Sequence, residues 1–269
     1  MIRFAAKEFA VFVATSLVAA LVILLFSRSA EGGLWDARAG GMVGAALAVT
    51  LPLVVLAAIL VAAIALGLGA LAARRPGSVI DRGLQGLAEI GAAIPHFWLG
   101  ILLAILFSTV LRWLPAAGFM PWTVNPLAAL SALILPALAL AIPQGLGLTR
   151  LVRRALVEAT SAGYVRAAQG RGLAPRDAFR LHALPNALRV VLAALGRQLG
   201  LLIAGSLIVE NVFYLPGLGR LIFDAIGAHD LTLARTAILI LALLLAGTMF
   251  LARLVQGWSD PRLAQGRAP

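Results

Sequence analysis

The sequence predicts an all-α integral membrane protein with six transmembrane helices, and three observations support this prediction. Hydrophobic residues make up 62% of the 269-residue chain and charged residues only 12%, whereas soluble domains average about 45–50% and 25%. The apolar residues gather in long blocks, each comparable to the ~20 residues that a helix needs to cross a bilayer. The basic residues gather between the blocks, mostly on one side of the predicted membrane. We therefore expect one transmembrane domain over residues 1–269.

The six predicted spans are residues 9–26, 42–73, 87–110, 127–151, 187–209 and 231–255. Block 42–73 is long enough to tilt or to extend beyond the bilayer. Pro52, Pro95, Pro136 and Pro143 lie inside blocks, and we expect kinks there because neighbouring helices can satisfy the freed backbone groups. The first block follows a basic start, as a signal peptide would. It exceeds the usual apolar region of about 7–15 residues, so an uncleaved helix is expected.

The arginines and lysines predict the orientation of the chain. With six spans, fifteen of them fall at one set of block ends and five at the other, leaving out Arg189 and Arg197 near or within the fifth block. Basic residues are enriched in cytoplasmic segments. Both termini and the polar segment at about 158–185 are therefore expected in the cytoplasm, with the chain in a cell (inner or plasma) membrane.

The composition also excludes several kinds of function. A net charge of +11 would suggest nucleic acid in a soluble protein, but here the positive-inside rule explains it, so membrane lipid and not nucleic acid is the expected contact. The chain has no cysteine and three widely separated histidines, so no metal site or cofactor is predicted. No phosphate-binding GxxxxGK[ST] motif and no nucleophile–base set occur. We expect no catalytic residues and no enzyme activity in this chain.

The polar segment that follows the fourth block has an ordered pattern. Residues 164–187 read YVRAAQGRGLAPRDAFRLHALPNA, and a segment this charged is not expected in hydrocarbon. Gly172 permits a sharp reversal, and Pro175 suits the first turn of a short helix. Phe179 shares a helix face with His182 and is a candidate anchor for a protein partner. Pro185 is expected to end the short helix before the fifth span.

Two interpretations of this segment follow from its residues. Arg176 and Arg180 flank Phe179, and aromatic and arginine side chains are the usual anchors of protein interfaces. A basic loop that contacts only anionic lipid is the alternative. The ordered placement of glycine, prolines and aromatic residue favours a protein-docking element.

The segment resembles the ATPase-docking loop of permease subunits of binding-protein-dependent ABC importers. The resemblance is carried by Arg166, Ala167, Ala168, Gly172, Leu173, Pro175, Arg176, Phe179, Arg180, His182, Leu184 and Pro185. Many importer families have glutamate where Arg166 stands, and arginine at that position is similar to the dipeptide/oligopeptide/nickel branch. These residues are the ones that the resemblance assigns to coupling with the ATPase.

Two further stretches resemble the same branch. Residues 94–100 (IPHFWLG) are similar to its third span, although a small hydroxyl residue is commoner where His96 stands; His96 is either a packing residue or part of the translocation pathway. Residues 205–213 and 216–219 resemble its fifth-span exit and external turn. There the outer mouth would include Glu210, Phe213, Pro216, Gly217 and Gly219. A turn or short lateral helix is expected, with a plain connecting loop as the alternative.

The resemblance implies a type I ABC importer permease fold with a cytoplasmic coupling helix. Such a subunit forms half of a pathway with a second homologous permease, docks separate ATPase subunits and receives solute from an external solute-binding protein. Peptides, nickel complexes or a related small solute would be the cargo, and the short segment between the first two spans, about 27–41, leaves that choice open.

An ATP-independent secondary transporter or channel is the alternative function. It would require intramembrane acidic or lysine pairs, and the spans contain few such residues, with Glu89 near an end and His96 deeper. A membrane-embedded enzyme would require a cluster of polar catalytic groups, which the sequence does not contain.

Overall fold

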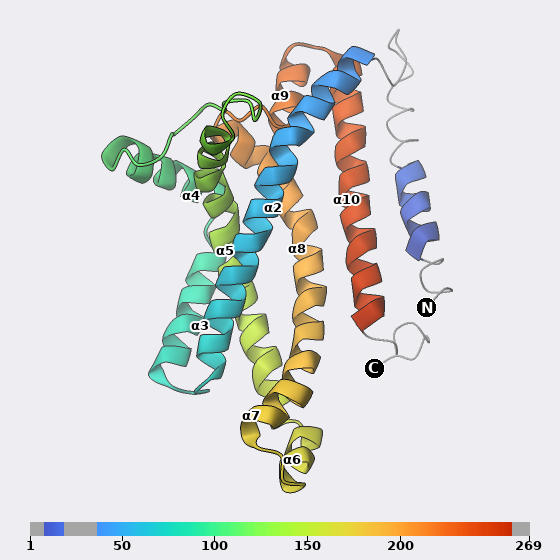
Figure 1. Ribbon diagram of the computed structural model, residues 1–269. Coiled ribbons are helices and arrows are strands. Elements are labelled where there is room, and N and C mark those ends of the chain that lie inside the picture. Colours follow the sequence, from blue (N-terminus) through green and yellow to red (C-terminus); the bar gives the residue numbers. More distant parts are fainter. Residues whose placement is uncertain (1–7, 19–36, 260–269) are drawn as a thin grey trace.

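The computed structural model of the protein describes residues 8–18 and 37–259, and this part of the chain is helical without any strand (Figure 1). The elements are the helix Glu8–Val18, α2 (Ala37–Ala73), α3 (Val79–Ala92), α4 (His96–Ala104), the π-helix η1 (Ile105–Val110), α5 (Pro126–Ser161), α6 (Gly163–Gly170), α7 (Pro175–Ala178), the π-helix η2 (Phe179–Ala183), α8 (Leu184–Val212), α9 (Leu218–Gly227) and α10 (Leu231–Ser259).

The bundle is elongated, and its two ends differ. Helices α6 and α7 form one end, and α9 lies at the opposite end (Figure 1). We call these the loop end (residues 162–183) and the α9 end (residues 213–230). The α2–α3 turn and the last turns of α10 point toward the loop end, so Arg74, Arg75 and Arg253 lie on the same side of the bundle as the arginines of the loop.

Four helical stretches are long and apolar enough to cross a membrane: Arg38–Ala73, Pro126–Ser161, Pro175–Val212 and Leu231–Gly257. They overlap the blocks expected at 42–73, 127–151, 187–209 and 231–255. The block expected at 9–26 overlaps Glu8–Val18, which is shorter than a span, and residues 19–26 lie outside the described ranges. The described residues therefore contain four spans, or five if the bent pair α3–α4 is one span, and not the six expected.

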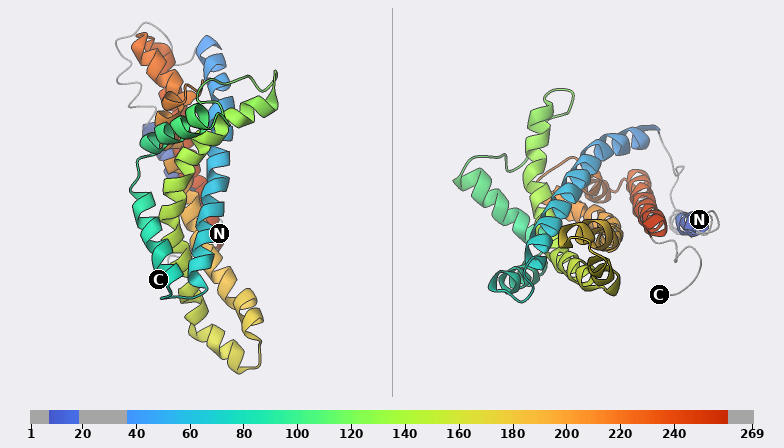
Figure 2. Two further views of the ribbon diagram at one scale, coloured as in Figure 1. Left: turned by 90° about the vertical axis from the view of Figure 1, so that its left-hand side faces the viewer. Right: turned by 60° about the horizontal axis from the view of Figure 1, so that its bottom comes forward.

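The block expected at 87–110 is not one straight helix. The chain bends by 96° between Val79–Ala92 and the stretch His96–Val110, and α4 runs across the bundle rather than along it (Figure 2). Pro95 is extended, with φ −65° and ψ 134°, and it caps the start of α4. A proline disfavours helical geometry in the residue before it. Pro95 therefore ends a helix, which corrects the expected kink, whereas Pro52, Pro136 and Pro143 do stay inside helices.

Helix α5 is the central element, and it packs against α2, α3, α4 and α8. The main core is formed by buried side chains of α2, α5 and α8, among them Leu53, Val61, Leu133, Leu140 and Leu202. Small residues bring these helices close together: a Cβ added at Gly69 would lie 2.6 Å from the Cβ of Val152, and one at Gly145 would lie 2.9 Å from the Cβ of Ile64. Small residues at helix contacts are typical of membrane bundles.

Two smaller packing units flank this core. At the α9 end, Leu218 and Ile222 of α9 are buried against Val43 of α2 and Leu233 of α10. On the outside, the helix Glu8–Val18 lies along α10. Its Phe9 and Phe12 rings are 6.0 and 5.3 Å from the Phe250 ring, and Glu8 is 3.0 Å from Arg253. These contacts place residue 8 toward the loop end.

We predict that Gly69→Ala destabilises the protein by about 1–3 kcal/mol, because the added methyl group overpacks the contact with Val152. Gly67→Ala is the matched control: it lies in the same helix, a Cβ there meets no atom within 4 Å, and alanine favours the helix by up to about 1 kcal/mol. Thermal unfolding of the two purified variants measures the difference. Equal midpoints would contradict the close α2–α5 contact.

Candidate functional site

The polar segment at the loop end is almost wholly helical. Helix α5 continues to Ser161, α6 follows after one extended residue, and a short turn leads into α7. Gly172 in that turn has φ +94°, the left-handed conformation that glycine adopts at little cost. Leu173 N–H donates to the Ala168 carbonyl at 3.2 Å, as in a helix C-cap. Pro175 occupies the first turn of α7, so both residues have the local geometry expected from the sequence.

Pro185 does not end the short helix, which corrects that expectation. The chain is helical from Pro175 to Val212, and it changes hydrogen-bond register in η2. There the Leu184 N–H donates to the Phe179 carbonyl, a π-type bond, and π-turns relieve local conflicts inside helices. Asn186 Nδ2 donates to the His182 carbonyl at 2.7 Å. The wider turn accommodates the proline and keeps α7 joined to α8.

The candidate anchor Phe179 is not an exposed side chain, which corrects a second expectation. It is half-buried and packs on the main core, next to the buried Ala178. The exposed apolar side chains at this end are Leu181, 65% exposed, and Tyr164, 45% exposed. The helical spacing of three and four around Ala178 and His182 turns Phe179 inward, so the outward face of the loop belongs to Leu181.

Some of the remaining residues expected to couple with the ATPase are buried or bonded within the loop, and others are exposed. Arg166 donates from Nε and Nη2 to the Ser161 carbonyl at 3.1 and 2.7 Å, and it thereby caps the C-terminus of α5. Ala168 is buried, whereas Ala167, Arg176 and Arg180 are exposed. Leu173 and His182 are half-buried, and Pro185 is exposed.

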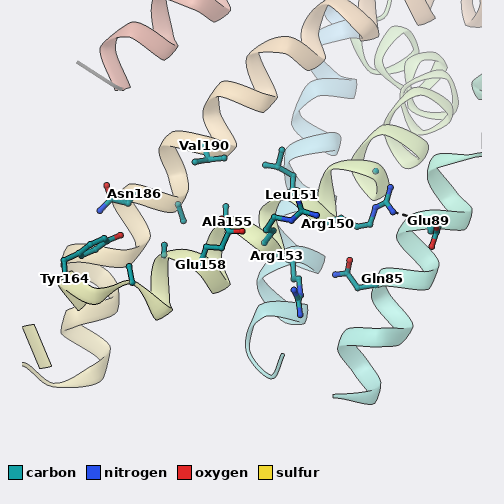
Figure 3. A pocket seen from close by; sticks show the side chains of 15 residues that line it. Gln85, Glu89, Arg150, Leu151, Arg153, Ala155, Glu158, Tyr164, Asn186 and Val190 are labelled. Atoms are coloured by element: carbon teal, nitrogen blue, oxygen red, sulfur yellow. Dashed lines mark ion pairs between the residues drawn. The ribbon is translucent and has the colours of Figure 1, made fainter. Parts of the chain in front are cut away.

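A cleft of about 1020 Å³ opens beside this loop, between α3, α5, α6 and α8 (Figure 3). Charged and polar side chains line it, including Gln85, Glu89, Arg150, Arg154, Glu158, Tyr164 and Asn186. Arg150 and Glu89 face each other across it at 4.0 Å, and both are largely exposed. The cleft therefore holds charges of both signs.

Arg153, which lines the cleft, forms an ion pair with the buried Asp81. Arg153 donates from Nε and Nη2 to the two carboxylate oxygens of Asp81, at 3.0 and 2.7 Å. Asp81 is 2% exposed and also accepts from the Gly77 N–H at 2.8 Å. The pair fastens the α2–α3 turn to α5. We did not predict it, although Ser78 and Asp81 have the spacing of a helix-capping box.

The segment after α8 is a built turn and not a plain connecting loop. Glu210 is fully buried, and its carboxylate accepts from Thr50 Oγ1 and from the Gly219 N–H, both at 2.7 Å. Thr50 Oγ1 in turn accepts from the Leu218 N–H at 2.8 Å. The carboxylate thus lies at the start of α9, where free N–H groups favour negative charge. The resemblance assigns Glu210 to the outer mouth, and the structure encloses its carboxylate within this turn.

The glycines of this turn make room for the carboxylate. A Cβ at Gly217 would collide with the Glu210 carboxylate, and one at Gly219 would lie 2.8 Å from the Leu207 carbonyl oxygen. Pro216 precedes the extended Gly217 that begins α9. Phe213 is buried, and a Cβ added at Gly100 of α4 would lie 3.1 Å from its Cε2 atom. Residues 210–219 therefore form a tight turn that leads into the short helix α9, in keeping with the expected turn or short helix.

His96 lies near the break between α3 and α4, and it is bonded to two glutamines in series. Gln144 Nε2 is 3.1 Å from His96 Nε2, and Gln198 Nε2 donates to Gln144 Oε1 at 2.7 Å. Sequence reasoning singled out His96 alone, because a glutamine inside an apolar block gives little signal by itself. Within residues 8–18 and 37–259, no group of three or more His, Cys, Asp or Glu side chains could hold a metal.

Comparison with known proteins gives a consistent result. Residues 65–265 match the family model described as "Binding-protein-dependent transport system inner membrane component". A Brucella abortus (strain 2308) protein named as a peptide transport system permease is 39% identical over 217 residues, covering 81% of this chain and 69% of that protein. The dipeptide transport system permease protein of Escherichia coli (strain K12) is 31% identical over 237 residues, covering 80% and 70%.

A solved structure shares the fold. The inward-facing MetNI methionine ABC transporter superposes on 84% of this chain and 100% of its own, with a TM-score of 0.65 and 19% sequence identity.

We predict that Glu210→Leu destabilises the protein by about 2–5 kcal/mol, because Thr50 and Gly219 would each keep a buried donor without an acceptor. Glu210→Gln should cost less, since the amide oxygen still serves one of them. Asp224→Leu is the control, because its carboxylate is largely exposed in a surface pair with Arg220. Chemical denaturation in detergent measures all three. A Glu210→Leu variant as stable as Asp224→Leu would contradict this role.

Proposed function

The chain belongs to the family of binding-protein-dependent transport system inner membrane components, and on that premise we propose that it is half of a peptide importer driven by a separate ATPase. It is a multi-pass permease subunit of an ABC importer. The relatives of known name are permeases of peptide, dipeptide and oligopeptide transport systems. Peptides are therefore the proposed cargo.

The observation that carries the proposal is the mechanical continuity of the loop end with the spans. Helix α7 continues through η2 into α8 without a break. Arg166 holds α6 against the last turn of α5, and Phe179 anchors the loop on the main core. An element held at both ends in this way transmits a push from a soluble partner directly to α5 and α8. This is what a subunit without a nucleotide site requires.

The outward face of the loop has the chemistry of a protein interface. Leu181 and Tyr164 are exposed apolar side chains, Arg180 directly precedes Leu181, and Arg176 is exposed in the same loop. Tyrosine and arginine are among the side chains that dominate binding energy at interfaces, and Leu181 is the more exposed of the two apolar side chains. The ATPase is the proposed partner on this face. Leu181 replaces Phe179 as the residue that enters its surface.

The remaining partners follow from the same assembly. A second homologous permease would complete the pathway, and a solute-binding protein would deliver peptide at the α9 end. ATP binding would bring the ATPases and their docked loops together and open the pathway at that end. The arginines at the loop end support a cytoplasmic location for it, with both termini on that side of the inner membrane.

We expect the tagged chain, extracted in mild detergent from its native membrane, to bring a P-loop ATPase and a second permease with it. Leu181→Asp should lower ATPase recovery by at least about tenfold, because a charge replaces an apolar anchor. Val79→Asp is the control: Val79 is 77% exposed and begins α3 beside the α2–α3 turn, outside residues 162–183. Mass spectrometry of the purified material measures both.

A wild-type chain that emerges alone, even after gentle crosslinking, would contradict the importer assignment. Normal ATPase recovery with Leu181→Asp would contradict only the choice of docking residue.

Orientation has its own test. A reporter that is active only in the cytoplasm should be active when inserted after Gly77 or Gly170 and silent after Gly118 or Gly217. The first two positions lie toward the arginine-rich loop end and the last two toward the α9 end. Activity measured in whole cells, normalised to the amount of fusion protein, checks this. The reverse pattern would invert the assignment.

A further inference from the structure

Three polar side chains from three helices meet inside the bundle. Gln198 of α8 bonds Gln144 of α5, which bonds His96 at the start of α4. We call this set the polar ladder. Each member is half-buried, so the ladder has one side against the protein and one open side. Polar groups on spanning helices rarely face hydrocarbon, and they mark interiors or aqueous cavities.

The ladder shares helices α5 and α8 with the cleft, although none of its three members is among the residues that line the cleft. On α5, Gly147, Leu151, Ala155 and Glu158 line the cleft, and Gln144 is one turn before Gly147 on the same face. On α8, Val190 lines the cleft, and the exposed Arg197 is two turns further along that face, beside Gln198. Gln85 and Glu89 of α3 lead toward His96. The cleft and the ladder therefore share the faces of α5 and α8 that run from the loop end into the bundle.

The hydrogen bonds give the ladder a direction. In the amide orientation of the structure, the Gln144 nitrogen faces His96 Nε2 and donates to it, which leaves Nδ1 to carry the proton of a neutral ring. Gln144 Oε1 accepts from Gln198, which leaves Gln198 Oε1 as an acceptor. Among the described residues neither His96 Nδ1 nor Gln198 Oε1 has an assigned partner. The ladder thus offers a donor at one end and an acceptor at the other.

We propose that the polar ladder is a substrate site within the pathway, and that it binds the backbone of a short extended peptide. His96 Nδ1–H donates to a peptide carbonyl, and Gln198 Oε1 accepts from a peptide N–H. Gln144 positions both by bonding each of them. Backbone groups alone are read, so the site is indifferent to peptide sequence. This inference rests on the proposed function and adds to it the group that the permease recognises.

The test uses the importer reconstituted in liposomes with its co-purifying subunits and binding protein. ATP-driven uptake of trialanine is compared with uptake of its analogue in which ester oxygens replace both peptide N–H groups. Wild type should prefer trialanine. Gln198→Leu should lower trialanine uptake by about two- to tenfold and reduce the preference by the same factor, because one hydrogen bond is lost. The binding protein is the same in both samples, so its own preference cancels when the trialanine-to-ester uptake ratio of Gln198→Leu is divided by that of the wild type.

Gln256→Leu is the matched control. Gln256 is a half-buried glutamine of α10 that makes one bond to the Ala193 carbonyl at 3.3 Å, and it lies outside the ladder. It should keep both the uptake rate and the preference.

Three results would overturn the inference. An unchanged preference in Gln198→Leu would mean that this oxygen does not read the peptide N–H. Loss of the second permease from the Gln198→Leu complex would mean that the ladder holds the two permeases together instead. Absence of trialanine uptake by the wild type, with the full complex assembled, would overturn the peptide assignment itself, and it is seen before any variant is made.

Discussion

The hydrocarbon core of a bilayer offers no hydrogen-bonding partner, and this constraint organises the polar residues of the bundle. At the α9 end, the Glu210 carboxylate accepts hydrogen bonds from Thr50 and Gly219. Beside the α2–α3 turn, the Asp81 carboxylate accepts hydrogen bonds from Arg153 and Gly77. Each carboxylate accepts hydrogen bonds from a side chain and from a backbone N–H, and each set holds a turn in place. The ladder between them is different, because its two ends remain open. Its unused hydrogen-bonding capacity is what makes it a candidate for binding cargo.

Short turns and close helix contacts suggest how motion could pass from the loop end to the spans. Helices α5 and α8 share the main core and extend into the loop end, where α6, α7 and η2 link them by short, capped turns. Close contacts at Gly69 and Gly145 hold α2 against α5. A displacement at the loop end therefore moves packed helices as units, because dense interiors shift between discrete arrangements rather than deform continuously.

Local chemistry accounts for the features that were predicted correctly. Long apolar runs predict long helices because only a helix satisfies its own backbone in lipid. Gly172 and Pro175 have few alternative conformations, so their geometry is readable residue by residue. The errors arose where neighbours decide the outcome. A proline can stay inside a helix, end it or follow a π-turn, and Pro52, Pro95 and Pro185 do each of these in turn.

The sequence by itself determined the class of the protein, the approximate helices, the arginine-rich end and the turn geometry at Gly172 and Pro175, because composition and short-range pattern are sufficient for these. Tertiary structure decided which side chains of the loop face outward, that Glu210 is buried, and that Gln144 and Gln198 bond to each other. These properties depend on pairs as distant as Thr50 and Glu210, or Asp81 and Arg153. No local pattern encodes which helix faces meet, because packing in three dimensions selects the partners.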